Sequence, residues 1–190
     1  MKSLGVAFAV VALLAGLAML TYAQWTRDLD RADRAIESGQ LQEALARYES
    51  VAARFDRVPA ARQMFAAEYD RALGNRLWAL YRLRRYDDTI ELAERAPVGA
   101  RPHFWSGCAL FDKALVEEKA DARLGWLTRA EDEFRKAIEA TPSDWDTKYN
   151  YELTSRLAAE LRKQPKTPPR QLMQLLRPPS PAGKPARSVG

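Results

Sequence analysis

An uncharged run of 20 residues near the start of the chain, Leu4 to Ala23, most constrains what this sequence can become. A helix of that length rises roughly 30 Å, which matches the hydrocarbon thickness of a bilayer. Each Leu, Val and Phe in the run favours insertion by about 0.3 to 0.6 kcal/mol, and no charged side chain opposes them. We therefore predict that residues 1–23 enter a membrane.

Two fates for this segment stay open. The residues around Ala23 resemble a small-residue cleavage site, but the run is longer than the apolar region of about 7 to 15 residues in a signal peptide. This length favours an uncleaved transmembrane anchor over a cleaved signal. A lipid anchor is excluded, because Leu17 stands where a lipobox requires cysteine.

The side of the membrane on which the rest of the chain lies follows from charges near the run. Residues 27–34 carry three arginines, which by count alone would hold the body in the cytoplasm. These arginines alternate with aspartates, however, and long domains translocate largely regardless of charge. The short flank with Lys2 also resembles the start of a signal. We predict an inner-membrane protein whose body faces a bacterial periplasm, with a cytoplasm-facing regulator as the alternative.

Charge is divided unevenly along the chain. The last segment, residues 165–190, holds five basic residues, no acidic residue and seven of the eleven prolines, so we expect a disordered, Pro-rich tail. Residues 3–164 then hold 24 basic residues against 25 acidic ones, so the folded body is nearly neutral. A nucleic-acid-binding domain would place its basic surface on the fold itself, and we expect no nucleic-acid partner.

Several chemistries are excluded by what the sequence lacks. One cysteine, Cys108, cannot form an internal disulfide, and together with the single His103 it cannot build a zinc site without many carboxylates. The chain contains no GxxxxGK[ST] or GxGxxG run and no calcium-binding loop motif. His103 has no nucleophile or acid at a diagnostic spacing and is interpreted as a packing or capping residue. We expect no enzyme activity, metal or cofactor; an unrecognised cell-envelope hydrolase is the alternative.

Apolar residues in residues 24–164 recur every three or four positions, which indicates helices. Breaks are expected at Gly39, Pro59, residues 97–102 and Pro142, because glycine and proline end helices. No alternating segment with hairpin chemistry appears. The sequence predicts an all-α domain.

The helices also repeat. Ala44 with Tyr48 resembles the second helix of a tetratricopeptide unit, and a fuller match comprises Ala130, Phe134, Ala137 and Pro142. A weaker copy surrounds Thr89, so the units are spaced by 45 and 41 residues, whereas about 34 is typical. We therefore expect a short tetratricopeptide-like stack of helical hairpins.

A last helix, from Trp145 to about Lys163, is expected to cap this stack. Ser143 and Asp146 match a capping box at its start. Around it we expect four buried side chains: Phe134, Ile138, Tyr149 and Leu153.

The stretch from Phe134 to Leu153, with Ala137, Pro142 and Asn150, resembles small membrane-anchored tetratricopeptide proteins encoded beside MoxR-type ATPases and von Willebrand A proteins. The MxaK-type accessory proteins of methanol oxidation are the members most similar in size and layout. This resemblance implies a role in maturing methanol dehydrogenase, including calcium insertion.

Stacks of this kind bind an extended peptide or a partner helix in a groove lined by the first helix of each hairpin. Arg71 and Asn75 are expected to line this groove, and Asn150 takes the corresponding position in the last unit. An arginine and an asparagine one turn apart can together hold a carboxylate, as carboxylate-clamping members of the family do. We predict a membrane-anchored scaffold that binds protein partners during assembly of a larger complex.

Overall fold

A computed structural model describes residues 2–163, with side chains described from Gly5 onward. Every regular element in this part of the chain is helical, which confirms the all-α prediction. The elements are α1 (Lys2–Glu37), α2 (Leu41–Arg57), α3 (Pro59–Met64), α4 (Ala66–Arg82), α5 (Tyr86–Ala93), the 3₁₀ turn η1 (Val98–Ala100), α6 (Pro102–Val116), α7 (Ala120–Ala140) and α8 (Trp145–Lys163). The predicted tail, residues 165–190, lies outside the described residues.

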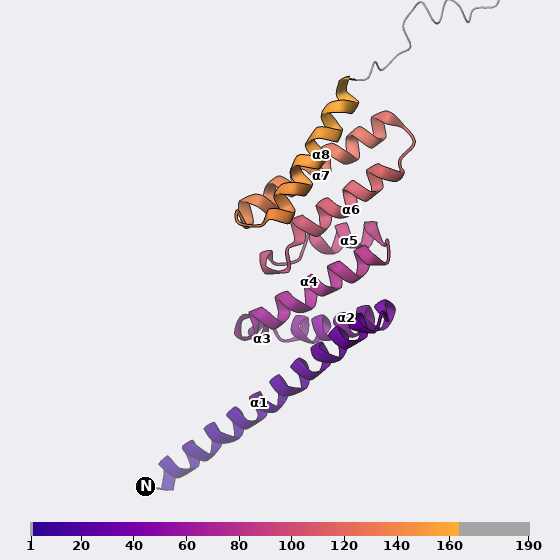
Figure 1. The fold of residues 1–190 in the computed structure, drawn as a ribbon. Helices are drawn as coiled ribbons and strands as arrows, with labels where there is room; N and C mark the ends of the chain where they lie inside the picture. The colour runs from indigo at the N-terminus through magenta and orange to yellow at the C-terminus, as the bar shows by residue number, and fades with distance from the viewer. Residues whose placement is uncertain (1, 164–190) are drawn as a thin grey trace, which may run out of the picture.

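The helices form a stack of antiparallel pairs (Figure 1). The end of α1 pairs with α2, α4 pairs with α5, α6 pairs with α7, and α8 closes the stack against α7. The first helices of successive pairs also contact one another, α1 with α4, α4 with α6, and α6 with α8. They therefore form a continuous row on one side of the stack.

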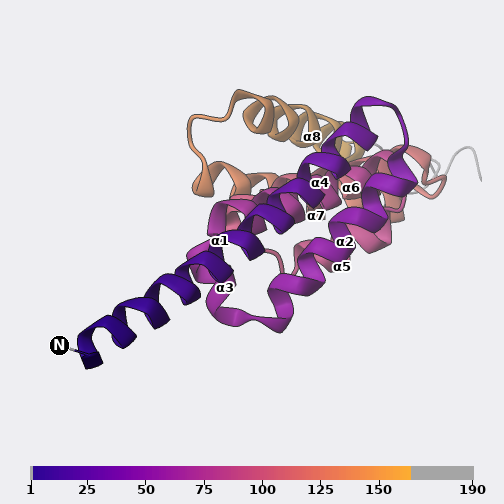
Figure 2. The same ribbon diagram turned by 90° about the horizontal axis from the view of Figure 1, so that it is seen from below.

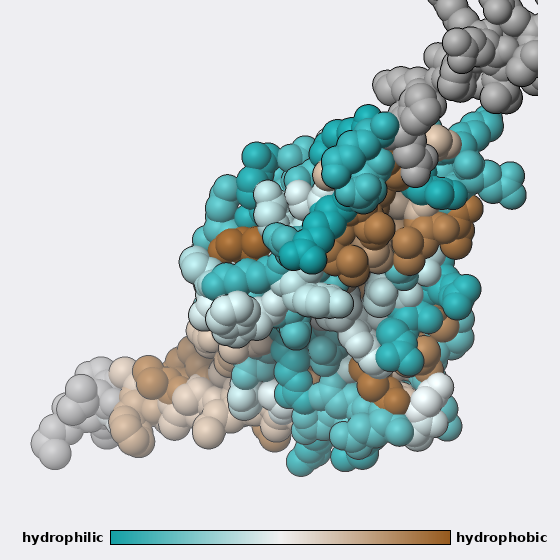
Figure 3. Space-filling model, turned by 45° about the horizontal axis from the view of Figure 1, so that its top comes forward, coloured by the Kyte–Doolittle hydropathy of each residue, from teal (hydrophilic) through white to brown (hydrophobic). Residues whose placement is uncertain are grey.

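Helix α1 is far longer than the others and has two different halves. Its apolar half projects from the body as a rod (Figure 3). Large side chains in this half, such as Phe8 and Leu13, are more than 70% exposed. By length and composition, α1 is the one helix among residues 2–163 able to cross a membrane. It continues past Ala23 without a break, so the apolar segment and the first helix of the stack are one helix.

Matched turns end the first helices of the first two pairs. Gly39 after α1 and Arg84 after α4 both have left-handed backbones, with φ of 75° and 58°. In each turn the next residue donates its backbone N–H to a carbonyl five residues earlier, from Gln40 to Ala35 and from Arg85 to Leu80. Such bonds satisfy carbonyls that a helix end would leave free. The two turns lie 45 residues apart, as do the starts of α2 and α5.

The core contains the small and aromatic residues that the repeat pattern singled out. Ala44, Thr89 and Ala130 are fully buried, and so are the rings of Tyr48 and Phe134. Gly107 of α6 faces Phe134 of α7 so closely that a Cβ at this glycine would lie 2.7 Å from the ring. Small side chains thus let paired helices approach each other, and aromatic rings fill the remaining volume.

Two expectations for α8 are wrong. The start of this helix is capped by Asp144 and not by Ser143: an Asp144 carboxylate oxygen accepts from the backbone N–H of Asp146 at 3.1 Å. Tyr149 is 70% exposed. The buried residues of α8 include Thr147, and a position two residues further lies about 200° around the helix, where it faces solvent. Ile138 and Leu153 are only half-buried.

Candidate functional site

A network of four polar side chains joins the first three long helices. Asp33 of α1 lies at its centre and accepts hydrogen bonds from Tyr48 of α2 and from Arg71 and Asn75 of α4. The Asn75 Nδ2 donor is 3.0 Å from Asp33 Oδ1 and 3.1 Å from the Tyr48 hydroxyl. Burial, with Asp33 beside the hydroxyl, raises the pKa of Tyr48, so this group stays protonated and donates to the carboxylate.

Arg71 and Asn75 therefore do together hold a carboxylate, but it belongs to the chain itself. Asp33 and Tyr48 were not singled out as site residues from the sequence, since they lie 38 and 23 residues before Arg71 and are brought to it only by stacking. Asn150 is not part of this network. It lies on α8 and donates to the backbone carbonyl of Asp146, 2.9 Å away.

A groove of about 530 Å³ opens beside this network along the row of first helices. Its apolar surface comes mainly from Ile36 of α1, Trp78 of α4 and Trp105 of α6. Its polar lining is Asp33, Glu37, Asp70, Arg71, Asn75 and Arg101. All three first helices and the turn η1 therefore contribute, so the groove exists only in the stacked chain.

The charges in the groove do not cancel. Arg71 pairs with Asp33, and Arg101 pairs with Asp144 outside the groove and lies 4.3 Å from the centre of the Phe104 ring. Glu37 and Asp70 have no ion pair within residues 2–163. The groove therefore keeps two negative charges beside two tryptophans.

Asp70 sits against the turn η1. A Cβ at Gly99 would lie 1.9 Å from an Asp70 carboxylate oxygen, so only glycine allows this close approach. Burial raises the pKa of Asp70 above its ordinary value. A cation placed beside this carboxylate would relieve the cost of keeping it charged.

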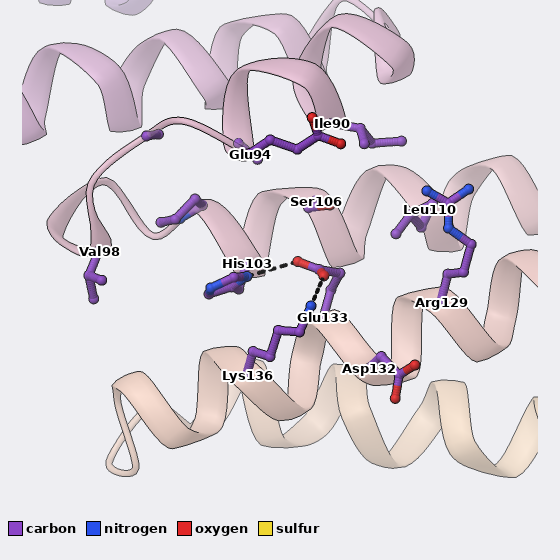
Figure 4. Close-up of a pocket in the computed structure, with 13 residues that line it drawn as sticks. Ile90, Glu94, Val98, His103, Ser106, Leu110, Arg129, Asp132, Glu133 and Lys136 are labelled. Carbon is purple, nitrogen blue, oxygen red and sulfur yellow. Dashed lines mark hydrogen bonds and ion pairs between the residues drawn. The ribbon is translucent and has the colours of Figure 1, made fainter.

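A second cavity, of about 460 Å³, lies on the other side of α6, between α5 and α7 (Figure 4). His103 Nδ1 lies 2.8 Å from Glu133 Oε2, and Lys136 donates to the other oxygen of Glu133 at 2.6 Å. Burial opposes ionisation of Glu133, but Lys136 and His103 prevail and lower its pKa. This pairing could not be predicted from the sequence, because His103 and Glu133 lie 30 residues apart.

Among the described residues, no hydrogen bond joins a nucleophile to a base in this cavity. Ser106 lines it, yet no hydrogen bond within the described residues joins Ser106 to His103. Burial raises the pKa of the Cys108 thiol to about 12, so the thiol is protonated and a weak nucleophile. Nor do residues 2–163 contain a group of three His, Cys, Asp or Glu side chains placed to hold a metal ion. The His103–Glu133 pair is best explained as a bridge between α6 and α7.

The arrangement with the most binding potential is therefore the groove between α1, α4 and α6. It combines apolar surface, hydrogen-bonding groups and two carboxylates without ion pairs in the described chain. In comparisons with known proteins, no protein-family model, no curated protein and no solved structure matches this chain.

Proposed function

We propose that this protein is a membrane-anchored, non-catalytic scaffold that binds protein partners in the groove between α1, α4 and α6. The groove is the observation that supports this proposal, because it spans three helical pairs and combines tryptophan surface with two acidic groups that have no ion pair within residues 2–163. Grooves of this kind suit an extended peptide segment better than a small molecule. The elongated apolar half of α1 supports anchoring in a membrane.

We further propose that the stack is a tetratricopeptide-type solenoid of the MxaK kind. The 45-residue offset between the first two pairs and the complete burial of Ala44, Thr89 and Ala130 support the repeat interpretation. On this proposal the body faces the periplasm and assists assembly of a larger complex, methanol dehydrogenase being the candidate that the sequence resemblance suggests. Asn150 would serve as a separate partner contact at the far end of the row.

The charge of the groove specifies the partner segment. Glu37 and Asp70 favour a positively charged side chain, and the Trp105 ring lies in the same groove. The Trp78 ring already has the Arg82 guanidinium 5.4 Å from its centre, which shows that it accepts a cation contact. The proposed ligand is therefore an extended peptide with at least one arginine or lysine. A peptide with glutamate at the same place would meet two like charges.

A binding measurement tests this choice. The full chain in lipid nanodiscs is titrated with a labelled nine-residue peptide that carries a central arginine, and with its glutamate twin. We expect the arginine peptide to bind at least about tenfold more tightly, a difference of roughly 1.4 kcal/mol. The double variant Glu37→Gln, Asp70→Asn should remove the preference, whereas Glu139→Gln, an exposed acid on α7, should keep it. Equal binding of the two peptides by the unaltered chain would refute the proposed partner.

Membrane orientation needs its own test. Alkaline phosphatase and a fluorescent protein that folds only in the cytoplasm are fused in turn to the C-terminus of the full chain. We expect phosphatase activity without fluorescence, since phosphatase becomes active only after export. Fluorescence without phosphatase activity would place the body in the cytoplasm.

A further inference from the structure

The connection between α2 and α4 lies level with the end of the apolar run. Contacts between α1 and α2 show this: Asp33 bonds to Tyr48, Asp28 bonds to Arg54, and Trp25 packs edge to face against Phe55 with ring centres 4.7 Å apart. Because α2 runs antiparallel to α1, its end and the following residues return toward the membrane. Figures 1 and 2 show α3 near the middle of α1, at the end of the stack where it contacts α2 and α4.

The level of this connection is fixed by Tyr22, the second-last residue of the run. The Tyr22 and Phe65 ring centres are 5.0 Å apart, and the Tyr22 hydroxyl donates to Glu68 at 3.0 Å. Tyrosine and tryptophan favour the boundary between lipid and water, which is where Tyr22 and Trp25 lie if the run spans the bilayer. Phe65 therefore lies at the depth of that boundary.

The side chains of this connection suit lipid. Residues 58–65, here called the interfacial segment, contain Val, Pro, two Ala, Met and Phe with one Arg and one Gln. Val58 is 46% exposed and Met64 is 70% exposed. Arg62, whose side chain is 41% exposed, pairs with Asp56 at 3.5 Å and lies 5.6 Å from the centre of the Tyr69 ring, so its charge is partly compensated by the protein.

Two other connections of the stack are polar, whereas the one between α5 and α6 also exposes an apolar side chain, Val98, which is 64% exposed. Ser38–Gln40 between α1 and α2 and Glu117–Lys119 between α6 and α7 consist of polar or charged residues and one glycine. The interfacial segment, with two exposed large apolar side chains, lies where the chain returns to the end of the membrane run. Arg57 at the end of α2 adds an exposed cation, which has no ion pair within residues 2–163. A basic residue at this level is attracted to lipid phosphates.

We propose that the interfacial segment rests in the membrane–water boundary as a second lipid contact, with Val58 and Met64 inserted between lipids. This inference rests on the membrane anchoring of the proposed function. Two contacts fix the body's orientation on the bilayer, which one helix alone does not. Asp33 lies ten residues beyond Ala23, so the partner groove opens about 15 Å from the lipid surface.

Site-directed spin labelling of the full chain in lipid vesicles tests the proposal. Single cysteines are placed at Val58 and Met64 in a Cys108→Ala background, with Leu13 in the apolar run and Tyr149 on α8 as matched exposed controls. For each label we measure the rate of collision with oxygen, which concentrates in lipid, and the rate of collision with a water-soluble nickel complex. The ratio of the oxygen rate to the nickel rate is high for a label in lipid. We expect the ratio at Val58 and Met64 to be several-fold above that at Tyr149 and to approach that at Leu13. Circular dichroism confirms that each variant is folded.

Two results would overturn the inference, and they differ in meaning. Ratios at Val58 and Met64 equal to that at Tyr149, with Leu13 in lipid, would show that α1 anchors the chain while the interfacial segment stays in water. A ratio at Leu13 equal to that at Tyr149 would show that α1 itself is not in the membrane. The second result would also remove the anchor from the proposed function.

Discussion

The first and last junctions of the stack are built by the same topology but held by different chemistry. The first junction, between α1, α2 and α4, centres on the Asp33 carboxylate and its three hydrogen-bonding partners. The last junction, between α6, α7 and α8, centres on the Phe134 ring packed against Gly107. A buried hydrogen-bond network thus lies at the centre of the first junction and a packed ring at the centre of the last one, although Trp25 also packs on Phe55 in the first and His103 bonds to Glu133 in the last.

This difference determines which substitutions should destabilise each junction. A polar network loses stability when a single donor is removed, because the remaining buried groups are left without partners. A packed ring tolerates changes of charge around it but not loss of volume. The groove that we propose as the partner site also lies at the first junction, beside the Asp33 network.

The largest effect is expected at the last junction. Replacing Phe134 with alanine removes a ring that is 1% exposed and should lower the free energy of unfolding by about 3 to 5 kcal/mol. The matched control is Tyr149→Ala, a loss of an exposed ring that should change stability by less than about 0.5 kcal/mol. Denaturant unfolding followed by circular dichroism measures both. A loss below about 1 kcal/mol for Phe134→Ala would show that this ring does not hold the junction.

An intermediate effect is expected at the first junction. Tyr48→Phe keeps the ring but removes the hydroxyl between Asp33 and Asn75, which should lower the free energy of unfolding by about 1 to 3 kcal/mol. Tyr149→Phe is the control, since the Tyr149 hydroxyl makes no hydrogen bond within the described part of the chain. Both variants are unfolded under the same conditions. If they are equally stable, the polar network contributes nothing to the junction.

A smaller effect should come from the two left-handed turns, which differ in residue type. Glycine adopts this backbone freely, whereas other residues meet a cost of roughly 1 to 2 kcal/mol. Gly39→Ala should therefore destabilise the protein by about 1 kcal/mol, and Arg84→Gly should stabilise it by up to about 1 kcal/mol. Thermal unfolding of the pair measures the difference. Changes of the same sign would mean that backbone strain does not distinguish the turns.

The smallest expected effect is on the stability of the fold at low pH. Burial opposes ionisation of Asp144, but the Thr147 hydroxyl and the Arg101 charge prevail and lower its pKa below the ordinary 3.8. A lowered pKa in the folded state means that stability is present above about pH 4 and is lost as the pH falls further. The variant Asp144→Asn, which cannot ionise at this position, should therefore lose less free energy of unfolding between pH 7 and pH 3 than the unaltered chain. Unfolding measured at pH 7 and pH 3 checks it, and an unchanged slope would exclude Asp144 as a contributor.

Local sequence rules predicted much of the fold because they act over a few residues. Gly39, Pro59 and Pro142 mark real helix ends, and α8 spans Trp145–Lys163 as expected. The same rules could not predict the side-chain contacts between residues that lie far apart in the sequence. Nothing near Asn75 in sequence shows that it meets Asp33, 42 residues earlier, and nothing near Asn150 shows that it bonds to its own helix. The continuity of α1 past Ala23 agrees with the sequence, because residues 24–37 contain no glycine or proline that would end the helix.

Photo-crosslinking tests the central claim, that the groove between α1, α4 and α6 receives a basic peptide, most directly. A benzophenone amino acid replaces Trp78 in the groove or, as the matched control, Trp145, which is 77% exposed on α8. The full chain in nanodiscs is irradiated with the arginine peptide, and adducts are located by mass spectrometry. The account predicts an adduct at position 78 and none at position 145. Equal labelling at both positions, or labelling at 145 alone, would contradict it.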